Sequence, residues 1–587
     1  MARKVFILAV LFAVALSGCL KDPEDERQPA KEDPEAVVQP GNDIGSGMDL
    51  IDGGMPLRYA LSADGRRLIA GAGQRSAFFD IDHIKRVDLT FSQSNWWTQL
   101  TNNYSSGTDI PARMTYDGKE LTDNVGVRFK GFTSYSQNRT EKKSFAISVD
   151  YQNDNQRVGG GYKNLNFNCG YNDNSFMREV VYAAVNERYI SALSSNYIDL
   201  YINGTYWGIY VNSQQIDNDF SKEWFLSKNG SRWRAGGGPG AGGTPGGGGR
   251  PGGGTPGAGG GMGAGTSSLN YLGDKGSSYE KYYELKYSSQ NAPWQDLADA
   301  CKVLNQTSTS ELEAKVREVL DLDRTLWFLA CEIIFMDEDS YVQKGGMDYY
   351  IFIDAATGRL TPLEYDGNEV LRSSNTSRSP FYNENSANYP LLNKLLAVPN
   401  IRQRYLAHFR TILEESFNPD AMNELIDLNA ARIDAYINKD PKKMMTYAQF
   451  TSEVSNLKSI VRTRYNYLMT NSEVNVKGLT ISDAQWSVNG EAWAQPSQND
   501  RVYVTAKVSG ATGVGTVYLF GSTGLAGNFL PIEMVKQGDD VYGCYIPAQN
   551  KGVRVRFYIE ATASNSAKTK TYEPARAEQD VYTYVVK

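Results

Sequence analysis

Residues 336–370 have the sequence MDEDSYVQKGGMDYYIFIDAATGRLTPLEYDGNEV, in which acidic residues flank an apolar, aromatic centre. Segments 348–354 and 359–365 have the aromatic and β-branched composition typical of strands, and AATG between them contains a glycine suited to a tight turn. The pattern predicts a β-hairpin. If Asp354 pairs with Arg359, then Tyr349 lies opposite Glu364, and Asp348 lies at the same end of the hairpin.

An apolar run, LWFLACEIIFM, precedes the hairpin and has the spacing of a buried helix. This helix would deliver the chain to the end of the hairpin at which the acids gather. The residues expected to converge there are Asp337, Asp339, Asp348, Glu364 and Asp366. Packed carboxylates repel one another unless a cation or a proton intervenes. The sequence therefore leaves two readings open, a cation-binding cluster and a set of solvated turn acids.

The composition excludes several classes of site. The chain has 587 residues, a formal net charge of −7, two histidines and five cysteines. Two histidines cannot supply a His-rich zinc site, and neither lies in a motif typical of a Ser-His-Asp triad. The cysteines lack metal-type spacing and form no disulfide framework. The net negative charge argues against a nucleic acid partner.

The N-terminus predicts export and anchoring. Residues 1–19 combine a basic start, an apolar run and LSGC, which resembles a lipobox with Cys19 as the lipidated residue. Residues 20–54 are acidic and proline-rich, as expected of a disordered tether, and KDPED resembles the export tags of Bacteroidetes surface lipoproteins. We therefore expect a lipid-anchored protein of the bacterial cell envelope, in the outer membrane, facing either the periplasm or the surface.

Three further regions follow the tether. Residues 55–472 mix strand-like and helical patterns, the latter mainly from 390 to 470, and predict an α+β domain. Within it, residues 235–268 are a Gly/Pro-rich insertion with almost no side chains to bury, expected to be disordered and to loop out. Residues 473–587 show short alternating runs between turn residues, which predict a small antiparallel β-sandwich, immunoglobulin-like or fibronectin-like.

Six segments in order resemble the spore coat protein H (CotH) kinases, atypical extracytoplasmic protein kinases with a distant kinase-like fold. The resemblance extends over roughly residues 87–468. The segments are VGVRFKGFTSYSQNRTEKKSFAISVD, LNFNCGYNDNSFMREVVYAAV, YINGTYWGIYVNSQQIDNDF, YYELKY, the loop DSY with the aromatic strand after it, and PLEYD. The family commonly has a glutamate where this chain has Gln214.

The resemblance implies a phosphoryl-transfer site, in which acids hold divalent cations and a catalytic Asp orients the acceptor hydroxyl. It implies that Asp339 is the catalytic residue and that Asp366 binds the metal. Glu364 and Asp348 would complete the metal shell, with Mg²⁺ or Mn²⁺ expected and Ca²⁺ as a further alternative.

The resemblance also assigns the residues that hold ATP. Lys143, or Lys142 beside it, would contact the α- and β-phosphates, and Arg128 with the KGFTSYS turn would supply further donors. Asp173 and Arg178 fit either a helix cap with its salt bridge or a support for the site, and Lys286 is a weaker candidate.

Two functions remain open on the sequence. The first is an anchored kinase that transfers phosphate from ATP to Ser or Thr of an envelope or secreted protein. The alternative is a catalytically inactive, kinase-like surface lipoprotein that binds a protein or a glycan. The retained Lys, Asp339 and Asp366 favour the enzyme, whereas the scarcity of ATP outside the cytoplasm favours the binding protein.

Overall fold

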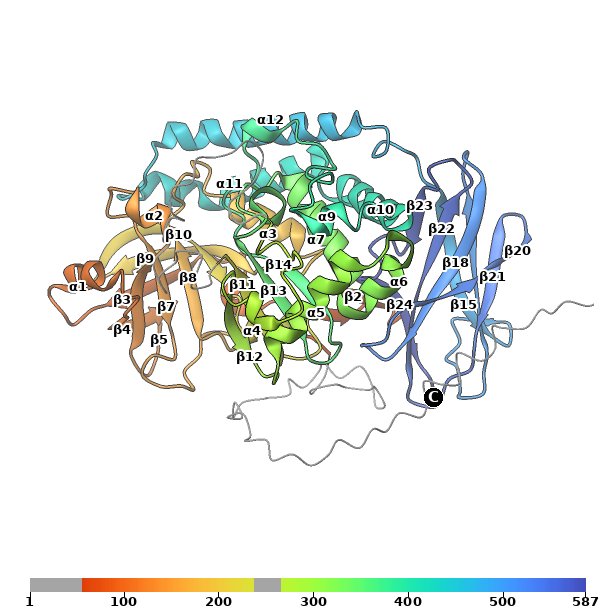
Figure 1. Cartoon of the computed structure of the whole chain (residues 1–587). Helices are drawn as coiled ribbons and strands as arrows, with labels where there is room; N and C mark the ends of the chain where they lie inside the picture. Colours follow the sequence, from red (N-terminus) through yellow and green to blue (C-terminus); the bar gives the residue numbers. More distant parts are fainter. Residues whose placement is uncertain (1–54, 237–264) are drawn as a thin grey trace, which may run out of the picture. The chain divides into compact units, whose positions relative to one another are not determined.

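The computed structural model describes residues 55–236 and 265–587 (Figure 1). Cys19, the signal peptide, the tether and most of the Gly/Pro-rich insertion lie outside the described residues. The described part is a mixed α+β structure, as the sequence predicts, with twelve α-helices and four sheets. No helix in this part combines the length and apolarity needed to cross a bilayer.

An eight-stranded sheet forms the first layer of the structure, in the order β3-β9-β10-β8-β7-β6-β4-β5. A further pairing of β3 with β4 closes seven of these strands into a barrel. The strands are β3 Lys85–Thr90, β4 Ile110–Tyr116, β5 Lys119–Glu120, β6 Val125–Lys130, β7 Ser144–Ser148, β8 Asn164–Asn168, β9 Ser195–Ile202 and β10 Thr205–Gln214. The helices α1 Trp96–Asn103, α2 Thr133–Ser136 and α3 Arg178–Asn186 accompany them.

Side-chain alternation gives the barrel strands two different faces. In β6, Val125, Val127 and Phe129 are buried in the hydrophobic cluster of the barrel. Because successive side chains point to opposite faces of a strand, Arg128 and Lys130 lie on the other face of the sheet. That face carries the polar residues described below.

A four-stranded sheet, in the order β12-β11-β13-β14, contains the hairpin predicted from residues 336–370. Its strands are β11 Gly230–Ala235, β12 Tyr283–Ser288, β13 Tyr349–Asp354 and β14 Leu360–Glu364. The hairpin register is confirmed: Tyr349 lies opposite Glu364, and the Asp354 backbone N–H donates to the Arg359 carbonyl at 3.3 Å. The preceding apolar run forms the buried helix α7 Leu322–Phe335, which is also as predicted.

The remaining helices are α4 Asn218–Trp224, α5 Pro293–Gln306, α6 Thr309–Val319, α8 Tyr341–Lys344, α9 Pro390–Asn393, α10 Pro399–Glu415, α11 Pro419–Lys439 and α12 Tyr447–Met469. Helices α9 to α12 confirm the helical pattern predicted after residue 390. Helix α12 begins with a capping box formed by Thr446 and Gln449, which satisfies two backbone donors of its first turn. The largest hydrophobic cluster draws on α3, α5, α7, α10, α11 and α12.

The C-terminal region consists of two sheets that contribute to one hydrophobic cluster. The five-stranded sheet contains β16 Glu491–Ala492, β15 Thr480–Val488, β17 Val502–Ser509, β21 Val541–Ile546 and β20 Val535–Gly538. The seven-stranded sheet contains β1 Tyr59–Leu61, β2 Arg67–Ala70, β24 Asp580–Val585, β22 Arg554–Ala563, β18 Val514–Thr523, β19 Leu530–Glu533 and β23 Lys570–Glu573.

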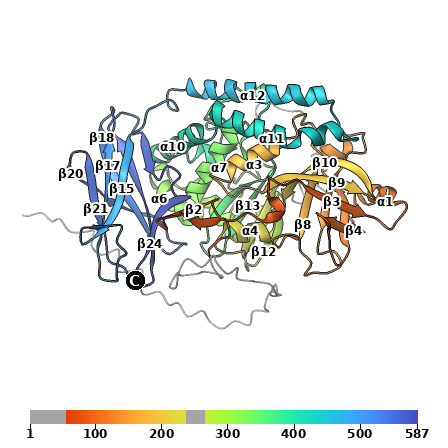
Figure 2. The same cartoon turned by 180° about the vertical axis from the view of Figure 1, so that it is seen from behind.

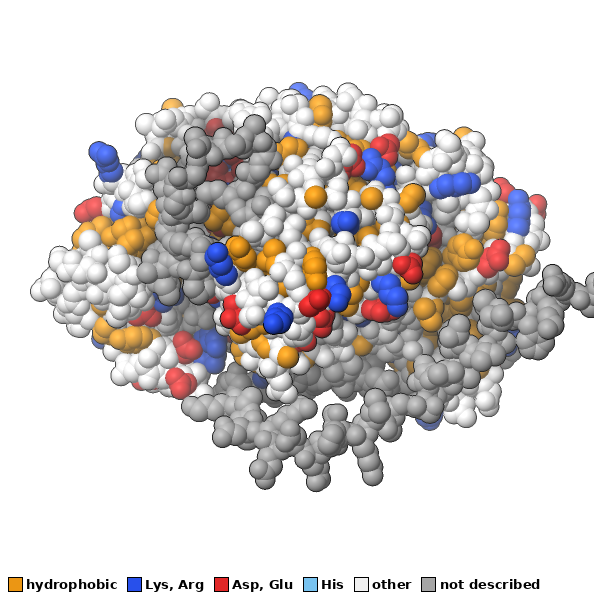
Figure 3. Space-filling view, viewed as in Figure 1, with side chains coloured by type: hydrophobic (Ala, Val, Ile, Leu, Met, Phe, Trp, Pro, Cys, Tyr) orange, Lys and Arg blue, Asp and Glu red, His pale blue; other side chains and the backbone are white. Residues whose placement is uncertain are grey.

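Strands β1 and β2 are the first of the described chain, yet they belong to this C-terminal sheet. Figure 2 shows β2 in this sheet with β24. Arg67 of β2 lies opposite Tyr582 of β24, and the Arg67 side chain pairs with Asp580. The sequence pattern had assigned residues from 55 onward to the domain that precedes the C-terminal region. On the face shown in Figure 3, acidic and basic side chains are interspersed with hydrophobic ones, without a broad field of one sign.

Candidate active site

A half-buried lysine on the outer face of the barrel marks the site. Lys130 ends β6, and its Nζ donates to Oδ1 of Asn166 on β8 at 3.0 Å. Burial lowers the pKa of Lys130, whereas the nearby carboxylates of Asp366 and Glu179 raise it. Lys130 of β6 is therefore within electrostatic range of two acids. Glu179 belongs to α3, and Asp366 belongs to the segment after β14.

Glu179 is held in place by two barrel strands. It lies in the first turn of α3, where a negative charge suits the helix dipole. Its Oε1 accepts from Nδ2 of Asn168 at 2.8 Å, and it also accepts from the Ser213 hydroxyl. Burial raises the pKa of Glu179, and these donors and Lys130 oppose that rise. The arrangement fixes the carboxylate next to Lys130.

Asp366 is the second acid within electrostatic range of Lys130. It follows β14 directly, and its Oδ1 accepts from the Asn368 backbone N–H at 3.2 Å. Burial raises the pKa of Asp366 to about 8, with Glu179 adding to the rise and Lys130 opposing it. Oδ1 of Asn368 is buried and has no hydrogen-bond partner among the described residues. Asp366 and Asn368 thus offer a carboxylate and an amide oxygen.

Hard oxygen donors of this kind suit Mg²⁺ or Mn²⁺. No three His, Cys, Asp or Glu residues in ranges 55–236 and 265–587 are grouped so that they could hold a metal ion by themselves. Mg²⁺ at nucleotide sites is usually bound by one or two carboxylates, with phosphates and waters completing its shell. The donor set at Asp366 fits that mode of binding rather than a metal cage made only of protein ligands.

Asp339 and Asp348 are bridged by a lysine. Asp339 lies in the loop after α7, and Asp348 immediately precedes β13. Lys344, the last residue of α8, pairs with Asp339 and lies 2.6 Å from Oδ2 of Asp348. Burial raises the pKa of Asp339, and Lys344 opposes that rise. Asp339 also adds to the raised pKa of Asp366, so the two acids are electrostatic neighbours.

Comparison of the sequence with protein-family models identifies the family of this chain. The model described as CotH kinase protein matches residues 127–468, more than half of the chain. The chain belongs to the CotH kinase family. A search of curated proteins finds no match. The matched range contains Lys130, Glu179, Asp339 and Asp366, and it ends before the two C-terminal sheets.

The three basic residues assigned to ATP by the family resemblance are engaged elsewhere in this CotH kinase. Lys142 is fully buried, pairs with Asp440 after α11, and donates to the Ile209 carbonyl at 2.8 Å. Lys143 donates to the carbonyls of Tyr135, at 2.9 Å, and Asn138.

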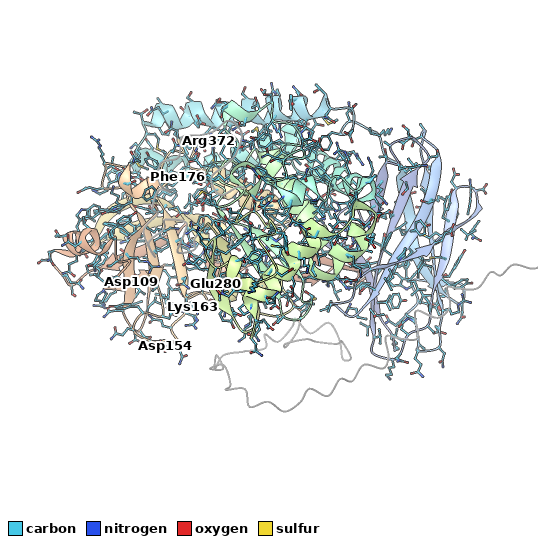
Figure 4. The ribbon with its side chains drawn as sticks, in the orientation of Figure 1. Asp109, Asp154, Lys163, Phe176, Glu280 and Arg372 are labelled. Carbon is cyan, nitrogen blue, oxygen red and sulfur yellow. The ribbon has the colours of Figure 1, made fainter. Side chains whose placement is uncertain are left out.

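Arg128 lies on the same face of β6 as Lys130 but pairs with Asp109, which is labelled in Figure 4, at 2.7 Å. The structure therefore brings none of these three side chains to Asp366. The lysine that it does bring there is Lys130, which the sequence interpretation included only as part of the KGFTSYS turn.

Glu364 lies within electrostatic range of Asp337, but its carboxylate accepts hydrogen bonds from the protein itself. It accepts from Nδ2 of Asn186 at 3.0 Å and from the Leu193 backbone N–H at 3.3 Å. Burial raises its pKa to about 7, and these donors oppose the rise. Asp348, the other expected metal ligand, is paired with Lys344 and lies 3.7 Å from Arg234. The structure does not gather Glu364, Asp348 and Asp366 into one metal shell.

Arg178 and Asp173 connect α3 to the segment that follows Asp366. Oδ2 of Asp173 accepts from the Arg178 backbone N–H at 3.0 Å, and the two side chains form an ion pair. Arg178 also pairs with Glu453 of α12, and its Nε donates to the Val370 carbonyl at 3.0 Å. These contacts join the start of α3 to the segment after Asp366. Lys286 forms an ion pair with Glu284, with 2.8 Å between Nζ and Oε1.

Proposed function

We propose that this CotH kinase is an active extracytoplasmic protein kinase, which transfers the γ-phosphoryl group of ATP to Ser or Thr of an envelope or secreted protein. The observation that carries the proposal is that Lys130, on the outer face of the barrel, lies within electrostatic range of Glu179 and Asp366, with Asp339 as an electrostatic neighbour of Asp366. Phosphoryl transfer requires these charges: a cation for the phosphates, an acid for the metal, and an acid for the acceptor hydroxyl.

Each residue has a distinct task in this proposal. A bound divalent cation supplies neutralisation of the charge on the transferred group. Asp366 and the amide oxygen of Asn368 would hold it, and Lys130 would donate hydrogen bonds to phosphate oxygens while Glu179 keeps its ammonium in place. Asp339 would accept the proton of the acceptor hydroxyl at its carboxylate.

The remaining features complete the proposal. Lipidation of Cys19 would anchor the chain in the bacterial envelope, with the outer membrane as the proposed site. The two C-terminal sheets would form an immunoglobulin-like or fibronectin-like sandwich, a module that commonly contributes to binding. The expected partners are protein substrates rather than nucleic acids, which agrees with the mixed charges in Figure 3.

Two variants test the proposal, one expected to lose nucleotide binding and the other expected to lose only phosphate transfer. Asp366→Ala should abolish the stabilisation by ATP with Mg²⁺ or Mn²⁺, which amounts to about 2.7 kcal/mol when the ligand is at 100 times its Kd. Asp339→Ala should retain that stabilisation and lose most phosphate transfer. Asp274→Ala is a matched control, because Asp274 pairs with Lys302 on the exposed surface. Thermal shift and transfer of labelled phosphate measure the two effects.

One observation favours the second candidate, an inactive binding lipoprotein. Lys344 pairs with both Asp339 and Asp348, and Arg234 lies 3.7 Å from Asp348, so two cations of the chain already balance these two acids. If the wild-type chain and Lys344→Met show neither a nucleotide-dependent shift nor transfer, the kinase proposal fails and the binding function takes its place.

A further inference from the structure

A serine-rich segment lies beside the candidate active site. Residues 371–379 have the sequence LRSSNTSRS and follow Asp366 by a few residues. Ser373–Asn375 form a single 3-10 turn, and Ser373, Ser374 and Ser377 are exposed. Hydroxyl groups of the type that a protein kinase modifies are thus exposed on the segment that follows Asp366 in the chain.

One of these hydroxyls contacts the catalytic loop directly. The Ser374 hydroxyl donates to Oε1 of Glu338 at 3.1 Å, and Glu338 immediately precedes Asp339. The Glu338 backbone N–H donates to the Glu369 carbonyl at 3.4 Å, which joins this loop to the segment after Asp366. Ser374 and Glu338 also line one open hollow of about 350 Å³, together with Glu369, Arg372 and Asn456 of α12.

The same segment carries basic groups that suit a phosphate. Arg372, labelled in Figure 4, pairs with Glu369 at 2.7 Å. Arg378 is 7% exposed, its Nη1 donates to the Asp337 carbonyl at 3.1 Å, and its Nη2 has no hydrogen-bond partner among the described residues. Burial lowers the pKa of Arg378, and the Glu338 carboxylate that holds Ser374 is among the groups that raise it. Arg378 therefore lies within electrostatic range of the Ser374 contact.

We propose that Ser374 is a phosphoacceptor of this chain, modified at its own active site. The proposal rests on the proposed kinase function. The Ser374 oxygen attacks the γ-phosphorus of ATP, the bond from that phosphorus to the β–γ bridging oxygen breaks, ADP leaves, and the hydroxyl proton passes to the Asp339 carboxylate. ATP supplies the phosphoryl group, and no other reactant is needed.

Phosphorylation would change the contacts of the segment. A phosphoserine carries a charge of about −1.5 to −2 at neutral pH. Glu338 would repel that charge, so the hydrogen bond from Ser374 would be lost. Arg372 and the unpartnered Nη2 of Arg378 would attract it, because guanidinium groups pair strongly with phosphate. The product would move Ser374 away from Glu338 and open the hollow that both residues line.

The test uses the purified chain from residue 20 onward, incubated with ATP and Mn²⁺ and analysed by phosphopeptide mass spectrometry. We expect phosphate on Ser374, incorporated at a rate per molecule that does not depend on protein concentration. Ser374→Ala should reduce incorporation at least tenfold. Ser377→Ala, which removes an exposed hydroxyl of the same segment, should leave it unchanged. Asp339→Asn should abolish it.

A parallel reaction with dephosphorylated casein separates the two proposals. If casein is phosphorylated while Ser374 is not, or if Ser374→Ala incorporates as much phosphate as the wild type, the Ser374 assignment is wrong and the kinase function stands. If neither casein nor the chain itself is phosphorylated, the kinase function fails, and the Ser374 assignment fails with it. A rate per molecule that rises with protein concentration would contradict modification of Ser374 within its own molecule.

Discussion

Replacement of Gln214 by Glu, the residue common in the family at this position, should destabilise the chain in a pH-dependent way. Gln214 is 2% exposed, and its side-chain amide donates to Oε1 of Glu223 on α4 at 3.0 Å. Glu223 also accepts from the Tyr162 hydroxyl. The substitution would remove a donor and set a second buried carboxyl group against the first.

The raised pKa of Glu223 gives the expected size of the loss in unfolding free energy. Burial raises this pKa from 4.5 to about 7, a difference that corresponds to about 3 kcal/mol in favour of the protonated carboxyl group. A folded-state pKa above the unfolded value means that stability falls as pH rises from 4.5 towards 7. A second carboxyl group in the same place should cost a similar amount. We expect Gln214→Glu to lower the free energy of unfolding by about 3 kcal/mol at pH 8 and by less than about 1 kcal/mol at pH 5.

Urea denaturation at the two pH values, followed by tryptophan fluorescence, measures this effect. The double variant Gln214→Glu/Glu223→Gln restores one carboxyl and one amide and should recover most of the loss. Wild-type stability of Gln214→Glu at pH 8, or an equal loss at both pH values, would refute the reasoning. Phosphate transfer should survive wherever the variant is folded. The reason is that Ser213 of β10 contacts Glu179 on the Lys130 side of the strand, whereas the next residue, Gln214, faces the other side and contacts Glu223.

Three further predictions concern the lysines. Lys142→Met should cost about 3–5 kcal/mol of stability, read from the urea midpoint, because it leaves a buried carboxylate without its partner; a stable variant that loses nucleotide binding would contradict this. Lys130→Met should raise the pKa of Asp366 further and weaken stabilisation by ATP with Mn²⁺, measured by thermal shift, and an unchanged shift would count against its role. Lys344→Met should lower the Mn²⁺ concentration needed for half-maximal stabilisation without nucleotide, because the charge of Asp339 is then no longer offset beside Asp366; a higher concentration would contradict this.

The hairpin and the helix before it were predictable from sequence because their signals are local. Alternating aromatic and β-branched residues, a turn glycine and one assumed pair, Asp354 with Arg359, fix the register that places Tyr349 opposite Glu364. The expected meeting of acids was right in part: Asp339, Glu364 and Asp366 all lie within electrostatic range of Asp337. The cation between Asp339 and Asp348, however, is Lys344 of the same chain.

The choice among lysines could not be made from the motif alone. Lys142 and Lys143 stand next to each other in EKKS, and a motif does not reveal which partner each side chain meets. Asp440 lies almost 300 residues away and pairs with Lys142, so that ion pair appears only in the folded chain. Alternation in VGVRFK offered a usable signal, because it places Lys130 on the face opposite Val127 and Phe129. The acidic residue Glu179 in the first turn of α3 was a second sequence signal for this site.

The pairing of β2 with β24 has a consequence for synthesis and for truncation. Strand β2 cannot pair with β24 until β24 has been synthesised, so this sheet is completed late. A fragment that ends at the boundary of the family match would leave β1 and β2 with an unpaired edge, and exposed edges invite association between chains. A soluble fragment of the catalytic region should therefore begin after β2. A chain that stops before β24 cannot pair β2 in this sheet.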